Sequence, residues 1–321
     1  YTVMMRDALG NAGSASSPAS ATTPSGPDLV APNPDPMTWA VVPAAGESGT
    51  LVVHEPFDYS SGGDLTNNGG TGFGGAWTTT KNSGNAGSFL TGSSGLSFTD
   101  GFSNVLPVSG NSATRTAANG RAEANRILSA ASRSALLADG TTIWFSVLHE
   151  RSNSIEHCGF IFGTGTFNVA SGWQLDGYTS GGEGFGFGSS NNEWIEIVGY
   201  DNAAGISKSA TSLNATSTRL LVGKIEWNAN GTDDTFSLYN VTDLTTEPTS
   251  PIATMSLDLD QANFDRVTLL SNKASATYDE IRFGSSFDVV VGGTGGGGSS
   301  DDSIAMTATT ASDVSGVEYY F

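Results

Sequence analysis

The sequence predicts an all-β protein with one large antiparallel β-sandwich at its centre. Gly accounts for 42 of the 321 residues and charged residues for only 14%, which suits short strands joined by tight turns better than long helices. Runs rich in β-branched and aromatic residues recur along the middle of the chain. Gly, Asn or Asp bounds nearly all of these runs, as expected for strands.

The first 50 residues predict two short strands joined by a linker. Residues 1–9 form a strand-like run that meets a Gly-Asn turn signal,. Residues 12–36 are rich in Ser, Ala, Thr and Pro, and the spaced prolines near their end favour an extended linker,. A short apolar strand is expected at 37–42. The chain starts and stops within strand-like runs, so we expect a segment of a longer secreted protein.

The middle of the chain predicts a succession of short strands. It opens with an apolar run at 51–59 and a Gly-rich stretch at 69–77. Further strands are expected at 142–148, 159–162, 172–175, 194–198, 219–227, 235–240, 267–270 and 280–283,. Residues 121–137 are rich in Ala and Arg and fit a helical period loosely, so at most two turns of helix are expected there,.

The charge balance excludes two classes of partner. The chain has 32 acidic residues against 13 basic ones, and its net charge is −19. A chain this acidic repels phosphate backbones and anionic membrane surfaces, so we expect it to bind neither nucleic acid nor membranes. Two explanations of the acidity stay open: a highly soluble surface, or carboxylates gathered for Ca²⁺.

Cys158 is the single cysteine, so no disulfide forms within the chain,. It lies in an apolar run at 158–162, and the neighbouring His157 points to the opposite face of a strand,. We therefore expect Cys158 to be a small buried side chain rather than a reactive thiol.

Catalytic motifs are missing from the sequence. A retaining glycosidase places two carboxylates on one face about 5–5.5 Å apart, whereas Glu193 and Glu196 are three residues apart and face opposite sides of a strand,. Glu226 stands alone. No zinc-binding spacing links the histidines, which are His54, His149 and His157,. We therefore expect that the chain is not an enzyme.

Five stretches carry a resemblance to a known fold family, at 55–59, 69–77, 142–146, 220–227 and 279–284. They resemble the concanavalin A-like lectin/glucanase superfamily, specifically the laminin G-like jelly-roll modules of large bacterial surface proteins. This resemblance implies an antiparallel two-sheet jelly-roll sandwich. The superfamily holds lectins, hydrolases, lyases and structural modules, so the resemblance says more about fold than about function.

The two ends resemble pieces of fibronectin type III or immunoglobulin-like repeats. The carrying residues are 1–11, 37–42 and 303–321. The resemblance implies an all-β fold with partial immunoglobulin-like strands at both ends. The expected order is a terminal strand of a preceding repeat plus linker at 1–24, a Pro-rich linker and first strand of a split repeat at 25–49, the jelly roll at 50–291, a Gly-rich linker at 292–302 and the continuation of the split repeat at 303–321.

The resemblance also implies a place for a sugar ligand. Sugar sites in this superfamily set exposed aromatic rings against sugar faces, with polar groups beside them. The matching candidates lie next to Gly and Asn turns and are Trp173, Tyr178, Trp194, Asn191, Asn192 and Asp176. For each aromatic residue the alternative of packing in the core stays open.

A structural calcium ion is the cofactor that the resemblance implies. Members of the superfamily often hold Ca²⁺ between the first strand and the last, where this chain has Glu55 and Asp279,. The alternative is that Asp279 caps a turn and Glu55 is solvated.

Two functions of different classes follow from these observations. The first is a structural or adhesive module of an extracellular or cell-surface protein, whose end strands pair with other copies or with the rest of the parent chain, as in a fibre assembled by β-strand complementation. The second is a glycan-binding module tethered to a polysaccharide-degrading enzyme, with polysaccharide as its ligand.

Overall fold

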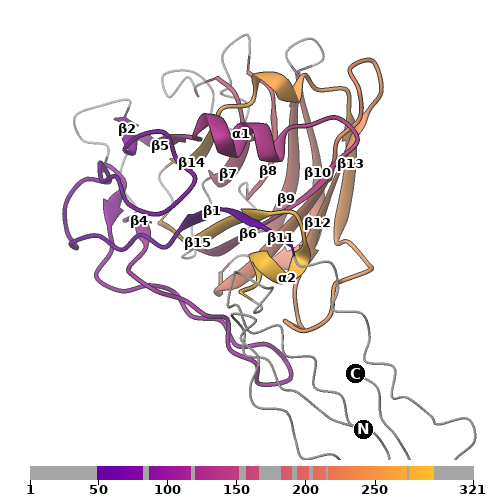
Figure 1. Ribbon diagram of the computed structural model, residues 1–321. Coiled ribbons are helices and arrows are strands. Elements are labelled where there is room, and N and C mark those ends of the chain that lie inside the picture. The colour runs from indigo at the N-terminus through magenta and orange to yellow at the C-terminus, as the bar shows by residue number, and fades with distance from the viewer. Residues whose placement is uncertain are drawn as a thin grey trace, which may run out of the picture. The chain divides into compact units, whose positions relative to one another are not determined.

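The computed structural model shows two antiparallel β-sheets packed face to face (Figure 1). It describes residues 49–81, 87–116, 120–151, 157–165, 182–189, 194–201, 205–214, 216–272 and 275–292. These residues belong to one unit within 46–299. The immunoglobulin-like strands and linkers predicted before 49 and after 292 lie outside the described residues, so they and the domain boundaries stay predictions.

In the described part of the chain, the first sheet has eight strands. Their order is β13–β12–β11–β6–β15–β4–β3, and β1 also pairs with β15. The bounds are β1 (Leu51–Glu55), β3 (Leu90–Thr91), β4 (Ala113–Arg115), β6 (Thr142–Arg151), β11 (Arg219–Glu226), β12 (Asp234–Asn240), β13 (Ala253–Leu257) and β15 (Ala276–Gly284).

The second sheet has seven strands among the same residues, in the order β10–β9–β8–β7–β14–β5–β2. Their bounds are β2 (Thr78–Lys81), β5 (Arg121–Ile127), β7 (His157–Gly163), β8 (Gly184–Ser189), β9 (Trp194–Asp201), β10 (Gly205–Asn214) and β14 (Arg266–Asn272). Neighbours are often distant in sequence: β7 pairs with β14, and β6 pairs with both β11 and β15. The all-β, two-sheet antiparallel jelly-roll sandwich predicted from the sequence is confirmed.

Aromatic rings fill the space between the sheets. The Phe145 ring of β6 has its centroid 5.5 Å from the ring of Phe160 in the opposite sheet and 5.4 Å from that of Phe283. Across the strand pair, Phe145 is opposite Gly223. A Cβ at Gly223 would lie 2.2 Å from the Phe145 ring, so the glycine makes room for the aromatic core. Buried rings of this size supply much of the hydrophobic stabilisation.

Two smaller apolar clusters lie on the outward sides of the sheets. On the first sheet, Trp144 and Tyr239 pack with α2 (Phe287–Val290) and are buried. On the second sheet, the outward cluster contains Ile161 and Leu270.

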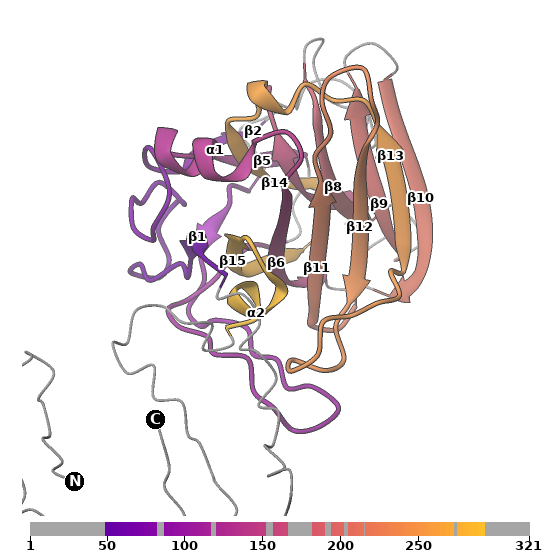
Figure 2. The same ribbon diagram turned by 45° about the vertical axis from the view of Figure 1, so that its right-hand side comes forward.

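Residues 121–137, where at most two turns of helix were expected, form a strand followed by a short helix. Residues Arg121–Ile127 form β5, and α1 spans Ala130–Leu136 beside the sandwich (Figure 2). Ser129 caps α1, because its Oγ accepts a hydrogen bond from Ser132 N at 3.1 Å,. A single 3-10 turn covers Gln261–Asn263. Within the described ranges, no helix is long and apolar enough to cross a membrane.

Candidate functional site

The outward side of the second sheet gathers polar residues onto one surface, which we call the outer face. Strand β9 turns Ile195 and Ile197 into the core, so Trp194, Glu196 and Val198 point outward,. The same alternation holds on the neighbouring strands. The outer face on β5, β7, β8, β9 and β14 comprises Glu123, Asn125, His157, Gly159, Ile161, Gly184, Gly186, Gly188, Trp194, Glu196, Val198, Tyr200, Thr268, Leu270 and Asn272.

The strand register aligns one row of the outer face across five strands. Glu196 on β9 is opposite Gly188, which is opposite Gly159. Gly159 is opposite Leu270, which is opposite Glu123 on β5. Strands lie about 4.8 Å apart, so the two acidic residues are about 19 Å apart. Because a glycosidase needs its carboxyl groups about 5–9.5 Å apart, Glu123 and Glu196 do not form such a pair.

The β5 end of this row carries an ordered polar network. Thr268 Oγ1 donates a hydrogen bond to Asn125 Oδ1 at 2.6 Å, and Asn125 Nδ2 donates to Glu123 Oε1. All three side chains are buried. Their polar groups are therefore held in place without a ligand.

The β9 end of the outer face is more open and more apolar. The Trp194 side chain is 40% exposed. Beyond it on the same strand, Val198 and Tyr200 form a small apolar cluster with Ile161 and Leu270. The exposed indole provides a surface on which a sugar ring can stack, whereas the members of this cluster are buried.

Glu196 Oε2, an acceptor, and Asn272 Nδ2, a donor, are outer-face atoms that are shielded from solvent and have no hydrogen-bond partner among the residues that the structure describes. A buried polar atom without a partner costs about 1–3 kcal/mol. Within the described ranges, these two atoms therefore have unused hydrogen-bonding capacity.

Of the six residues predicted to bind sugar, Trp194 is the one that the structure describes, and it lies on the outer face. The other five lie outside the described residues, and their part in a sugar site stays a prediction. They are Trp173, Asp176, Tyr178, Asn191 and Asn192.

The first predicted calcium ligand, Glu55, is buried and surrounded by donors. Its Oε2 accepts hydrogen bonds from Trp77 Nε1 and from the Tyr59 hydroxyl, both at 2.8 Å. The same oxygen forms an ion pair with Arg126 of the opposite sheet. Burial raises the pKa of Tyr59 to about 12, so its hydroxyl remains a donor. The alternative prediction that Glu55 is solvated is wrong.

The second predicted ligand, Asp279, lies at a bulge in β15. There the strand changes partner, pairing with β4 up to Tyr278 and with β1 from Ile281 onward. Asp279 Oδ2 accepts a hydrogen bond from Leu96 N at 2.7 Å and Oδ1 accepts one from Glu280 N at 2.8 Å. Burial raises the pKa of Asp279 to about 8. This carboxyl caps two backbone N–H groups at a strand bulge rather than in a turn.

Glu280 completes the bulge in a left-handed backbone conformation, with φ of 48°. Its carboxylate lies 2.6 Å from His54 Nε2 and 2.7 Å from an Arg282 nitrogen. It also accepts a hydrogen bond from Ser109 N at 2.5 Å. Residues with positive φ other than Gly are uncommon, and this one is fixed by three partners.

The calcium site stays a prediction. Strands β1 and β15 do pair, with Glu55 opposite Ile281. However, the protein's own donors occupy the oxygens of both Glu55 and Asp279. Among the residues that the structure describes, no group of three or more His, Cys, Asp or Glu side chains is placed to hold a metal ion.

Sequence reasoning missed a polar cluster between the sheets. Cys158 is buried, as predicted, and its Sγ lies 3.6 Å from His149 Nε2 and 3.1 Å from Ser189 Oγ. Burial lowers the pKa of His149 to about 4 and raises that of the Cys158 thiol. Both groups are therefore neutral near pH 7, so the pair does not form a reactive thiolate.

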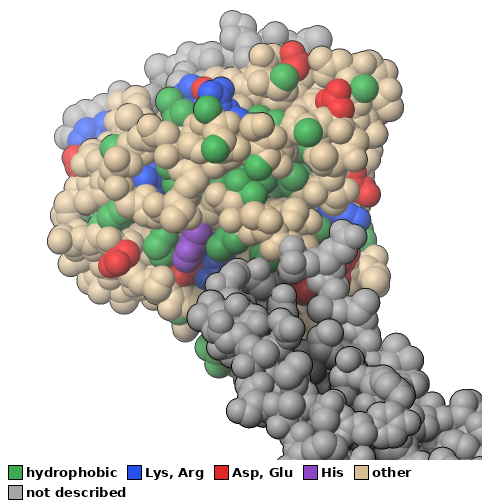
Figure 3. All heavy atoms as spheres, viewed as in Figure 1, with side chains coloured by type: hydrophobic (Ala, Val, Ile, Leu, Met, Phe, Trp, Pro, Cys, Tyr) green, Lys and Arg blue, Asp and Glu red, His purple; other side chains and the backbone are tan. Residues whose placement is uncertain are grey.

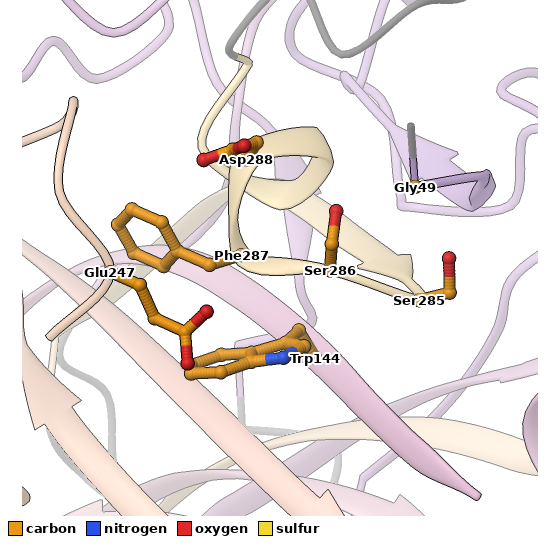
Figure 4. A pocket seen from close by; sticks show the side chains of 7 residues that line it. All are labelled: Gly49, Trp144, Glu247, Ser285, Ser286, Phe287 and Asp288. Atoms are coloured by element: carbon orange, nitrogen blue, oxygen red, sulfur yellow. The ribbon is translucent and has the colours of Figure 1, made fainter. Parts of the chain in front are cut away.

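A pocket of about 340 Å³ lies on the outward side of the first sheet. Figure 4 shows its lining residues, which are Gly49, Trp144, Glu247, Ser285, Ser286, Phe287 and Asp288. Trp144 is 3% exposed, which leaves little of the indole for stacking. The Ser286 hydroxyl is shielded against Gly49, where a Cβ would lie 1.9 Å from it. We therefore do not place the sugar site in this pocket.

No protein-family model matches the sequence, and no curated protein matches it either. Several solved structures are similar in fold. The CBM2 module of the evolved Dit protein of Lactobacillus casei BL23 phage J-1 is 12% identical with a TM-score of 0.37, and the match covers 74% of this chain and 96% of that one. A Bacillus licheniformis β-glucanase is 12% identical with a TM-score of 0.37, covering 70% and 98%. A glycosyl hydrolase family protein from Mycobacterium fortuitum is 13% identical with a TM-score of 0.36, covering 73% and 99%.

These comparisons correct the expectation that the chain is not an enzyme. A β-glucanase and a glycosyl hydrolase family protein are among the similar structures, so the fold gives no ground for excluding catalysis. The sequence argument compared carboxylates within one strand only. In the structure, carboxylates from separate strands share one face, as Glu123 and Glu196 do, although these two are too far apart to act as a pair.

Proposed function

We propose that the chain is a glycan-binding module that takes a polysaccharide on the outer face of its second sheet. The observation that carries this proposal is the exposed Trp194 indole, which points outward from β9. Extended sugar chains present alternating apolar ring faces and hydroxyl groups. The outer face offers a matching combination of an aromatic ring, glycine residues and polar groups.

The arrangement of side chains suits a chain of sugar rings lying across the strands. Gly159 and Gly188 add no side chains to the row beside Glu196, and both are buried. Glu196 Oε2 and Asn272 Nδ2 supply an acceptor and a donor for hydroxyl groups,. The three strand spacings that separate them span about 14 Å, which is longer than one sugar ring.

The proposal is tested by replacing the exposed indole. We expect the full chain to bind at least one neutral polysaccharide in a glycan array or in affinity electrophoresis. Trp194→Ala removes the stacking surface and should weaken binding about tenfold or more, because aromatic contacts of this kind contribute about 1–2 kcal/mol. Trp194→Phe should retain part of the affinity.

The matched control is Phe102→Ala, which removes an aromatic ring that is 71% exposed on a different part of the molecule. It should leave polysaccharide binding unchanged. The proposal fails if the wild-type chain binds no glycan, or if Trp194→Ala binds as tightly as wild type.

An adhesive role in a larger extracellular protein or fibre remains a prediction from the sequence. The strands that would pair with other copies lie outside the described residues. Sedimentation velocity of the full chain tests it, since a fibre subunit self-associates and a chain that stays monomeric at high concentration does not.

A further inference from the structure

The loop between β3 and β4 carries an unusual group of exposed hydrophobic side chains. Phe102 is 71% exposed, Val105 64% and Val108 39%. All three fall within seven consecutive positions of one loop, residues 92–112, which we call the display loop. Scattered exposed hydrophobic residues need no explanation, whereas a contiguous group marks an interaction site.

The tip of the display loop is held in one conformation by Asp100. This carboxylate accepts hydrogen bonds from Phe102 N and Asn104 N, and from Leu244 N of a neighbouring loop, each at 2.8 Å. Burial alone would raise the pKa of Asp100, but these hydrogen bonds outweigh it and lower the pKa to about 2. Ser103 takes a left-handed conformation, with φ of 70°, which is costly outside Gly. The network therefore fixes a strained turn that points Phe102 outward.

The base of the display loop is anchored to the first sheet. Leu106 is buried in the outer cluster with Trp144 and α2, and Leu96 and Phe98 pack against the same cluster. The β15 bulge adds polar anchors, because Asp279 binds Leu96 N and Glu280 binds Ser109 N. The apolar base is covered while the apolar tip is left in solvent.

The surroundings of the tip are acidic. Residues 92–112 and the adjoining residues 241–252 contain Asp100, Asp243 and Glu247, and no Lys or Arg. Arg282, which donates to Pro107 O, is buried and paired with Glu280. Gly101 N donates to Thr242 O at 3.1 Å, which places these two segments in contact. Glu247 is exposed. A second copy of the chain would meet this acidic rim with its own, and an anionic membrane would be repelled.

We propose that the display loop docks into an apolar pocket of a partner protein whose rim is lined with Lys or Arg side chains. The Phe102 ring fills the pocket, Val105 and Val108 contact its edge, and the acidic rim pairs with the basic one. A sugar ligand is disfavoured at this tip, because the Asp100 and Asn104 side chains, which could bind hydroxyl groups, are bonded to each other. Preorganisation of the loop reduces the entropy lost on docking.

The proposal is tested with a small host that reproduces the partner's chemistry. Amino-substituted β-cyclodextrin has an apolar cavity with a basic rim, and the neutral and sulfated forms are its controls. In NMR titrations of the full chain, we expect shifts in the display loop and binding at least about fivefold tighter for the amino form than for the neutral form, with none for the sulfated form. Added salt should reduce the difference.

Matched variants locate the effect. Phe102→Ser should abolish binding of the amino form, and Glu247→Gln should weaken it. Ile127→Ser, at a side chain 47% exposed at the end of β5, should do neither. Because the hosts are glucose rings, Trp194→Ala is included. Loss of binding in Trp194→Ala with no change in Phe102→Ser would assign the host to the sugar site and overturn the proposal.

Three further results would also overturn it. One is equal binding of the amino and neutral hosts, because the acidic rim then contributes nothing. Another is self-association of the full chain in sedimentation velocity that Phe102→Ser removes, which would make a second copy the occupant. The third is binding to phosphatidylcholine vesicles that depends on Phe102, which would make the occupant a lipid surface.

Discussion

At the scale of single residues, Glu55 and Arg126 explain how the sandwich tolerates charge in its interior. Arg126 on β5 points between the sheets, where it meets Glu55 of β1 and also donates to Gly69 O and Gly75 O. Its guanidinium carbon lies 4.0 Å from the centroid of the Phe73 ring. One side chain thus fastens the Gly-rich stretch to both sheets, and the pair is satisfied on every side.

We expect Arg126→Met to lower the free energy of unfolding by about 3–5 kcal/mol, because it leaves the Glu55 carboxylate buried without its cation. Urea denaturation of the full chain measures this. The matched control is Lys224→Met, which breaks an exposed ion pair with Glu226 and should cost about 1 kcal/mol or less,. Similar small losses in both variants would contradict a structural role for the buried pair.

Predictions for single residues were correct where they depended only on the alternation of side chains along one strand. The burial of Cys158 and the opposite orientation of His157 followed from alternation along β7,. The contact of Cys158 with His149 did not, because His149 comes from the opposite sheet and no local pattern pairs the two strands. Glu55 was misplaced for the same reason, since its partner Arg126 lies on another sheet.

At the scale of elements, the bulge in β15 joins three parts of the fold. Its residues pair with β4 on one side of the bulge and with β1 on the other, and they also anchor the display loop. The Asp279 carboxyl is central to this junction. Because its pKa is raised from 3.8 to about 8, the folded protein retains a proton that the unfolded chain releases.

This linkage gives Asp279 a pH-dependent effect on stability. Its contribution is greatest at low pH and is lost as the pH rises from about 4 to about 8. We therefore expect the free energy of unfolding to fall between about pH 7 and about pH 8.5, and to fall less in Asp279→Asn. Above pH 7 the raised pKa of Asp234, about 6, contributes little. Urea denaturation at each pH measures this free energy. If it falls equally steeply with pH in the wild type and in Asp279→Asn, the assignment to Asp279 is contradicted.

The helix-leaning stretch shows how tertiary contacts override local propensity. Ala122 and Ala124 favour a helix in isolation, yet both are buried in the core as alternate residues of β5. The tightly packed core requires small side chains at these inward positions. Alanine meets this requirement, and alanine also has the highest helix propensity. The hairpin between β11 and β12 turns at Asn230-Gly231, where Gly231 has φ of 91°, because a turn is decided by residues adjacent in sequence.

At the scale of the whole molecule, the net charge of −19 is an unfavourable term in folding. On the side of the sandwich seen in Figure 3, charged side chains are scattered among neutral polar ones rather than gathered. Scattered like charges repel one another over distances comparable to the screening length of dilute salt. Part of the acidity therefore promotes solubility at a cost in stability.

Raising the salt concentration from about 0.05 M to about 0.5 M should increase the melting temperature of the full chain by several degrees, because salt screens this repulsion. Sodium chloride and choline chloride should act alike in differential scanning fluorimetry. A decrease in melting temperature would mean that ion pairs outweigh the repulsion.

The same measurement tests the predicted calcium ion. A specific site requires that CaCl₂ raise the melting temperature beyond NaCl of equal ionic strength, and that EDTA lower it. An unchanged melting temperature with EDTA would remove the calcium prediction.

The pairing of β1 with β15 also places the start of the first strand side by side with the end of the last. Ser285 N donates to Thr50 O at 3.1 Å, and Thr50 N donates to Ser285 Oγ at 2.9 Å. The first and last strands are thus closed against each other at about one strand spacing, roughly 5 Å. A sandwich closed in this way is suited to circular permutation, because new ends can be opened at an exposed turn while a short linker joins the old ones.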